Sequence, residues 1–158
     1  MKTIFLDKLI LSVSNKFSID FKSKNIKFDL NIEKGKNFQI IGDEDKLKQV
    51  FINLLANAIK FTGPGGTVCI ELYVNKNKVI AKVKDNGIGI KKEDLPYIFE
   101  RLYRGDKSRR ETEGSGLGLT IVKKILTLHS AAIDVESTDS TGTSFTLYFN
   151  RNRRISNE

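Results

Sequence analysis

Apolar residues recur along this chain at two spacings, one helical and one extended. Steps of three and four predict helices over residues 5–21, after Asp43 to about residue 61, and over 117–129, with a shorter helix near 95–102. Alternation with polar residues predicts strands over 26–32, 38–41, 68–74, 79–83, 133–136 and 144–149. These elements predict an α/β fold, a two-layer α/β sandwich in which about three helices cover one face of a mixed sheet.

Turn residues between these elements refine the expected layout. Gly35 separates the first two predicted strands, which favours a β-hairpin between them. Asp43 precedes the long central helix and is expected to be its N-cap. The core face of that helix is expected to consist of Leu47, Val50, Phe51, Leu54, Leu55 and Ala58.

The length and composition indicate a single globular domain. The chain has 158 residues, 39% of them hydrophobic, and we expect the domain to occupy residues 1–150, followed by a basic tail at 151–158. It has neither a long apolar run nor a signal peptide, which predicts a cytoplasmic domain without direct membrane contact. The single cysteine, Cys69, lies in a predicted strand and is interpreted as a structural thiol.

The chain is basic, with a net charge of +8 from 27 Lys and Arg against 19 Asp and Glu. This balance suits nucleic acid, a membrane surface or a small anionic ligand. Much of the excess charge lies within residues 101–110 and in the tail. A solvated end explains the tail, and a bound polyphosphate explains the middle cluster better than DNA does, because glycine clusters flank it.

Two glycine clusters, at residues 85–90 and 114–119, enclose a polar segment. Glycine allows a backbone to approach a ligand closely. The second cluster leads into a predicted helix, whose free N–H groups and dipole favour phosphate. The pair therefore predicts a nucleotide site with a movable cover.

A polar stripe on the central helix is a second candidate for ligand binding. Asn53, Asn57 and Lys60 are spaced by four and three, so they share a line away from the core face. An amide oxygen suits Mg²⁺, which takes few protein ligands in addition to phosphates. A solvated helix face is the alternative, and the glycine clusters favour the metal-phosphate interpretation.

Five motifs in series resemble the ATP-binding catalytic domain of bacterial sensor histidine kinases, within the superfamily that includes gyrase and MutL. The motifs are the asparagine-containing helix at 45–62, the first glycine box at 85–90, the phenylalanine box at 98–106, the second glycine box at 114–119 and the final segment at 142–145. The resemblance covers nearly all of residues 3–150 and implies a Bergerat-type ATP-binding fold.

The resemblance also implies roles for individual residues. Asp85 would accept a hydrogen bond from the adenine amino group, Thr143 would support the same pocket, and Asn57 would bind Mg²⁺. Asn53, Lys60 and Arg104 would approach the phosphates, and residues 91–116 would form a lid over ATP. The nucleotide-binding positions of the two glycine boxes would be Gly87, Gly89, Gly114, Gly116, Leu117 and Gly118.

By this resemblance the chain would transfer the γ-phosphate of ATP to a histidine on a separate dimerisation domain of a parent kinase, for relay to a response regulator. The parent protein could be anchored in a membrane. The only histidine, His129, lies at a helix end and is interpreted as a packing residue rather than the phosphate acceptor. Where gyrase-like relatives carry a water-activating glutamate, this chain has Asn53, and an amide cannot act as a general base.

Two alternatives keep the same fold: a nucleotide-binding regulatory module and an anti-sigma-type serine kinase. The paired asparagines favour the histidine-kinase branch, since the serine kinases resemble gyrase in keeping the glutamate. A nucleic-acid binder is the weakest alternative, because only the net charge supports it and no aromatic stacking pattern accompanies the charge.

Overall fold

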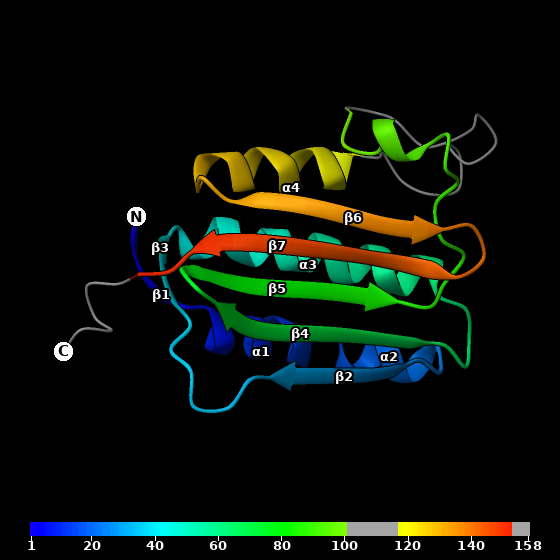
Figure 1. Ribbon diagram of the computed structural model, residues 1–158. Coiled ribbons are helices and arrows are strands. Elements are labelled where there is room, and N and C mark those ends of the chain that lie inside the picture. Colours follow the sequence, from blue (N-terminus) through cyan, green and yellow to red (C-terminus); the bar gives the residue numbers. More distant parts are fainter. Residues whose placement is uncertain (101–116, 153–158) are drawn as a thin grey trace.

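The computed structural model describes residues 1–100 and 117–152, which form a sheet layer and a helix layer (Figure 1). The strands of the main sheet are β2 (Lys27–Ile32), β4 (Thr67–Asn75), β5 (Lys78–Asp85), β6 (Ala132–Thr138) and β7 (Gly142–Asn150). The helices are α1 (Leu6–Lys16), α2 (Ser18–Ser23), α3 (Glu44–Phe61) and α4 (Leu117–Leu128), with a short 3₁₀ turn, η1 (Leu95–Tyr97). Two further short strands, β1 (Lys2–Phe5) and β3 (Gln39–Gly42), pair with each other.

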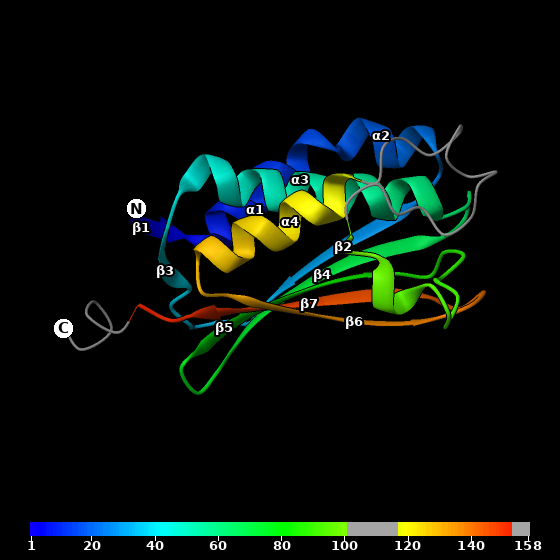
Figure 2. The same ribbon diagram turned by 90° about the horizontal axis from the view of Figure 1, so that it is seen from above.

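The main sheet is mixed, with the strand order β2-β4-β5-β7-β6. β2 runs parallel to β4, and the other neighbouring strands are antiparallel. The helices lie together on one face of this sheet, as the view from above shows (Figure 2). The predicted two-layer α/β sandwich is confirmed.

The predicted β-hairpin between residues 26–32 and 38–41 is wrong. β2 pairs in parallel with β4, whereas β3 pairs with β1 in a separate antiparallel sheet. A parallel pair needs a long crossover, and α3 supplies it here. Alternation in the sequence identified both segments as strands but carried no information about their partners.

The predicted helix over residues 5–21 forms with an interruption, and the strand that precedes it was not predicted. Residues 2–5 form β1, because their backbone pairs with β3, and α1 begins only at Leu6. The helical path then breaks at Phe17, which has φ −96° and ψ 2°, before α2 begins at Ser18. The spacing of the apolar residues could reveal neither the pairing of residues 2–5 with β3 nor the break in the helix at Phe17.

The central helix α3 forms as predicted. Its N-cap residue, Asp43, accepts a hydrogen bond from the Lys46 N–H at 3.1 Å, and this bond lowers the pKa of the Asp43 carboxyl. All six residues of the predicted core face are buried. Phe51 on this face contacts Phe149 of β7, with ring centroids 6.4 Å apart. The helix is therefore fixed against the middle of the sheet, and its polar stripe lies along its flank.

The two described residues after β7, Arg151 and Asn152, form backbone hydrogen bonds with the rest of the domain. The Arg151 N–H donates to the Asn77 carbonyl at 2.9 Å, and the Asn152 N–H donates to the Gln39 carbonyl at 2.8 Å. Within residues 1–100 and 117–152, no helix combines the length and apolar character that crossing a membrane requires.

Candidate functional site

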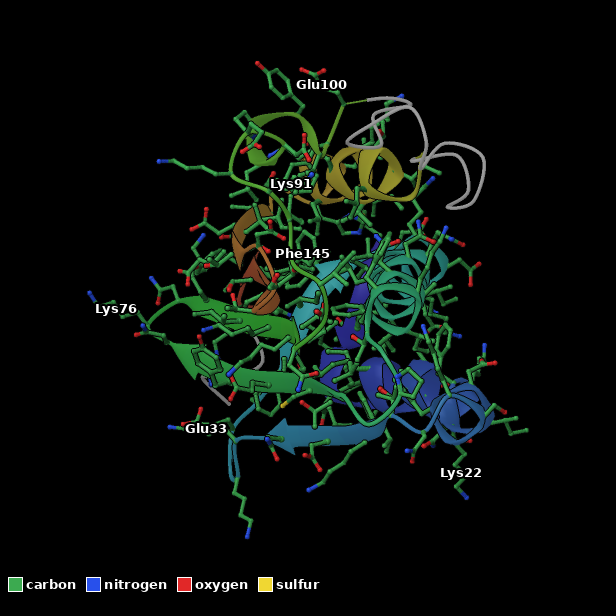
Figure 3. The ribbon with its side chains drawn as sticks, turned by 90° about the vertical axis from the view of Figure 1, so that its right-hand side faces the viewer. Lys22, Glu33, Lys76, Lys91, Glu100 and Phe145 are labelled. Atoms are coloured by element: carbon green, nitrogen blue, oxygen red, sulfur yellow. The ribbon has the colours of Figure 1, made fainter. Side chains whose placement is uncertain are left out.

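One end of the sandwich brings together the C-terminal ends of α3 and β5 with the N-terminal ends of α4 and β7, on the right of Figure 1. Figure 3 looks onto this end, with Phe145 near its centre, between the sheet and the helices. Four segments that are distant in the sequence therefore meet here.

Asp85, the last residue of β5, is half-buried at this end of the sheet. Its Oδ1 accepts a hydrogen bond from the Gly87 N–H at 2.9 Å. Burial raises the pKa of the Asp85 carboxyl, while the backbone N–H groups of Gly87 and Thr143 act in the opposite direction. The carboxylate is thus held in a fixed position but has lost part of its hydration.

A partly enclosed cavity lies beside this carboxylate and has a volume of about 60 Å³. Asp85, Asn57 and Thr143 supply its polar groups. The rest of its wall is formed by Phe61, Gly89, Ile90, Leu119 and Phe145. The volume is far below the roughly 300–1,000 Å³ of a pocket that encloses a whole drug-sized ligand. A mainly apolar wall with a few polar groups suits one flat ring with a hydrogen-bonding edge.

The glycines of the first cluster make room for the backbone of neighbouring segments. A Cβ at Gly87 would collide with the Phe61 carbonyl, and a Cβ at Gly89 would collide with the Thr138 carbonyl. Gly89 also has a φ of +73°, which disfavours other residues. Close packing holds this loop between α3 and the β6–β7 turn, and its position shapes the cavity wall.

The polar stripe of α3 divides between three environments. Asn57 lines the cavity, whereas the Asn53 Nδ2 donates to the Gly118 carbonyl at 3.2 Å and its Oδ1 accepts from Gln49 at 2.7 Å. Lys60 is exposed, with its Nζ 5.8 Å from the Phe61 ring centroid. Asn53 therefore joins α3 to the first turn of α4.

Several expected site residues lie outside the described part of the chain. These are Arg104, Gly114 and Gly116, together with most of the expected lid. Leu117 is the first residue of α4, and Gly118 follows it with 3.9 Å between an added Cβ and the nearest atoms of Asn53. The second glycine box thus leads directly into a helix, as predicted.

The apolar wall of the cavity was not among the expected site residues. Phe61, Ile90, Leu119 and Phe145 all lie in or next to the motifs, but their apolar character resembles that of ordinary core positions. Their closeness in sequence to expected site residues is a signal that could have identified them: Phe61 follows Asn57, Ile90 follows Asp85, and Leu119 and Phe145 follow Gly118 and Thr143.

His129 lies at the opposite end of α4 and is tied to two helices. Its Nε2 accepts a hydrogen bond from the Asp43 N–H at 3.0 Å, and its Nδ1 lies 2.8 Å from the Ile125 carbonyl, to which it donates. The ring also fills the space beside Gly42, where an added Cβ would lie 2.9 Å from the His129 Cδ2. These contacts agree with the predicted packing role.

Comparison with known proteins gives concordant matches. A family model described as histidine kinase-, DNA gyrase B-, and HSP90-like ATPase matches residues 42–153. Sensor histidine kinase YvrG of Bacillus subtilis is 36% identical over 135 residues, which cover 84% of this chain and 23% of YvrG. The phosphate regulon sensor protein PhoR of Pseudomonas aeruginosa is 34% identical over 149 residues, which cover 94% of this chain and 33% of PhoR.

Among solved structures, the nucleotide-free catalytic domain of histidine kinase ThkA superposes with a TM-score of 0.83 and 29% sequence identity. The match covers 95% of both chains. The chain therefore spans a third or less of the two curated relatives, but almost all of this solved catalytic domain.

Proposed function

Because this chain belongs to the family of histidine kinase-, DNA gyrase B- and HSP90-like ATPases, we propose that it is the ATP-binding catalytic domain of a sensor histidine kinase. It transfers the γ-phosphate of Mg-ATP to a histidine on the dimerisation domain of its parent protein, for relay to a response regulator. One observation supports this proposal most strongly: Asn57, Asp85 and Thr143, from three separate elements, line a single cavity.

The cavity suits the adenine ring. Phe61, Leu119 and Phe145 offer apolar surface to the faces of a flat base, and Asp85 offers a fixed acceptor to an amino group. A hydrogen bond to a carboxylate is stronger than one between neutral groups. The amino group of adenine would also restore a donor to a carboxylate that burial has partly dehydrated.

The flank of α3 suits the metal and the phosphates. Asn57 is half-buried at the cavity, and its amide oxygen is a hard donor of the kind that Mg²⁺ accepts. Asn57 would hold the ion, which would supply positive charge to neutralise that of the phosphates. Lys60 lies one turn further along the same flank, where its exposed ammonium group can approach phosphate oxygens.

The residue at position 53 favours transfer to an acceptor over hydrolysis. The Asn53 amide is not basic near neutral pH, so it cannot take a proton from an attacking water. Both of its polar atoms are also engaged, with Gln49 and with Gly118 of α4. Catalysis would then rest on positioning the acceptor and the γ-phosphate and on stabilising charge.

Calorimetric titration of the Asp85→Asn variant with Mg-ATP tests the proposal. Losing a charge-assisted hydrogen bond costs about 1.5–3 kcal/mol, so affinity should fall roughly tenfold to a hundredfold. Asp134→Asn is the matched control, because it makes the same charge change at an exposed position on β6 and should leave affinity unchanged. Equal ATP affinity of wild-type protein and Asp85→Asn would refute the assignment of the base pocket.

A further inference from the structure

One hydroxyl group joins three segments behind the cavity. The Ser137 Oγ on β6 accepts a hydrogen bond from the Ile90 N–H at 2.7 Å and donates to the Gly142 carbonyl at 2.8 Å. It also lies 2.9 Å from the Thr143 Oγ1 on β7. Ile90 and Thr143 line the cavity, whereas Ser137 does not. Ser137 therefore acts on the cavity only through its neighbours.

The Ser137 hydroxyl has a limited number of donor and acceptor sites, and this limit determines the direction of each of its hydrogen bonds. A serine hydroxyl has one hydrogen to donate and two lone pairs to accept with. The Ile90 amide can only donate, so it occupies one lone pair, and the Gly142 carbonyl can only accept, so it takes the hydrogen. The contact with Thr143 is then satisfied only if the Thr143 hydroxyl donates to the second lone pair of Ser137.

This direction fixes what Thr143 offers to a ligand. Its hydroxyl hydrogen is used towards Ser137, so only lone pairs remain for the cavity. Asp85 is paired with Thr143 across β5 and β7, and its carboxylate is also an acceptor. The polar wall thus presents acceptors from two neighbouring strands. An amino group, which has two N–H donors, matches such a wall, and a carbonyl oxygen does not.

We infer that Ser137 is a positioning residue for base selection, which orients the Thr143 hydroxyl so that the site prefers a 6-amino purine over a 6-oxo purine. The inference rests on the proposed function, since it concerns the same cavity. It adds a residue outside the cavity wall that sets the hydrogen-bonding character of the wall.

The fold does not depend on this hydroxyl alone. The loop that carries Ile90 is also held by the Ser140 N–H, which donates to the Ile88 carbonyl at 2.7 Å. Gly89 packs directly on the Thr138 carbonyl in addition. Removing the Ser137 hydroxyl should therefore release the Thr143 hydroxyl while leaving the loop in place.

The test compares the dissociation constants of Mg-ATP and Mg-ITP, since hypoxanthine carries an oxygen where adenine carries its amino group. Wild-type protein should bind ATP more tightly. In Ser137→Ala the Thr143 hydroxyl can turn and donate to the 6-oxo group, so the ratio of the ITP to the ATP dissociation constant should fall about five- to tenfold. A purely structural role for Ser137 would weaken both nucleotides equally and leave the ratio unchanged.

Three further variants sharpen the comparison. Ser137→Thr keeps a hydroxyl and should retain the wild-type ratio. Thr141→Ala removes a hydroxyl of the same β6–β7 turn, which donates to the Thr138 carbonyl at 3.0 Å, and should also leave the ratio unchanged. Thr143→Val removes the oriented acceptor itself, so it should lower the ratio, and adding Ser137→Ala to it should cause no further fall.

The results of these titrations distinguish a failure of the proposed function from a failure of the role inferred for Ser137. Wild-type protein that binds neither nucleotide would contradict the proposed function and this inference together. Wild-type protein that binds ATP, with an unchanged ratio in Ser137→Ala or in Thr143→Val, would overturn the inference and leave the proposed function standing.

Discussion

Asp85 meets two opposed requirements at the scale of a single residue. Ligand recognition benefits from a carboxylate in a dry, fixed position, but burial of a charge costs free energy in the absence of a ligand. The raised pKa of Asp85 reflects this cost, which the N–H groups of Gly87 and Thr143 only partly offset. Residues that serve binding in this way are expected to reduce the stability of the empty protein.

This conflict predicts a pH-dependent effect of Asp85→Asn on the nucleotide-free protein. A carboxyl whose pKa is raised on folding contributes stability below its ordinary value of 3.8, and that contribution is lost as the pH rises through the folded pKa. The asparagine variant cannot ionise, so its free energy of unfolding should rise relative to wild type as the pH rises above 3.8, and the difference should level off once the folded-state carboxyl is ionised. Urea unfolding at several pH values measures the difference.

Asp134→Asn again serves as the control, because the Asp134 carboxylate is exposed to water on β6. The pH-dependent rise of Asp85→Asn should exceed any change that Asp134→Asn shows over the same pH range. A relative stability of Asp85→Asn that falls with rising pH would contradict the burial argument.

The contacts of His129 distinguish a histidine that packs between two helices from one that accepts phosphate. Both ring nitrogens are engaged with backbone groups, of Asp43 and of Ile125, so the ring fastens the end of α4 to the start of α3. A phosphate acceptor needs a free ring nitrogen facing the γ-phosphate, and this ring lies at the far end of α4 from the cavity. The contacts of His129 thus agree with its predicted packing role.

At the scale of elements, the sequence predicted element types better than their partners. Periodicity identified α3, α4 and the strands of the main sheet, because each buries one face and therefore alternates or repeats. It could not predict that β2 pairs with β4, because the pairing is decided by the crossover through α3. It also extended the first helix into β1 and across the break at Phe17, since both segments carry apolar residues at suitable spacings.

The end of α4 provides a prediction about an element boundary. Ser130 follows this helix with a φ of +53°, and the Ala131 N–H closes the turn on the Leu126 carbonyl at 2.8 Å. Glycine adopts this left-handed conformation without the steric cost that a serine Cβ carries. Ser130→Gly should therefore raise the free energy of unfolding by roughly 0.5–1 kcal/mol.

Ser12→Gly is the matched comparison, because the same substitution falls on an exposed position inside α1. There the lower helix propensity of glycine should reduce stability. Denaturant unfolding of the two variants distinguishes the cases, and a Ser130→Gly variant that is less stable than wild type would show that the serine side chain stabilises the turn.

At the scale of the whole molecule, the site exists only because the sandwich is complete. Asn57, Asp85 and Thr143 were expected to act together and do line one cavity, although they come from α3, β5 and β7. The neighbouring glycines singled out Asp85 and the polar stripe singled out Asn57, whereas Thr143 was predicted only through the resemblance to histidine kinase catalytic domains. Ser137 was not predictable, because it occupies an unremarkable position in an alternating strand and gains its role only through pairing with Thr143.

The ties between α3 and α4 also belong to this scale. Asn53 bonds to Gly118 at the start of α4, and His129 bonds the end of α4 to the Asp43 backbone. The helix flank proposed for the metal and the helix start proposed for the phosphates are thereby held in a fixed relation. Such a frame suits a domain that presents a γ-phosphate to an acceptor on another domain.

Incubation with γ-labelled Mg-ATP, with and without the dimerisation domain of the parent kinase, tests the central claim most directly. We predict that the isolated chain binds ATP but neither labels itself nor releases phosphate at an appreciable rate, because both ring nitrogens of its one histidine, His129, are engaged with backbone groups and the Asn53 amide cannot activate water. Adding the dimerisation domain should produce acid-labile label on the histidine of that domain, and Asn57→Ala should abolish it. Label on His129 of the isolated chain, or rapid phosphate release without an acceptor, would contradict this account.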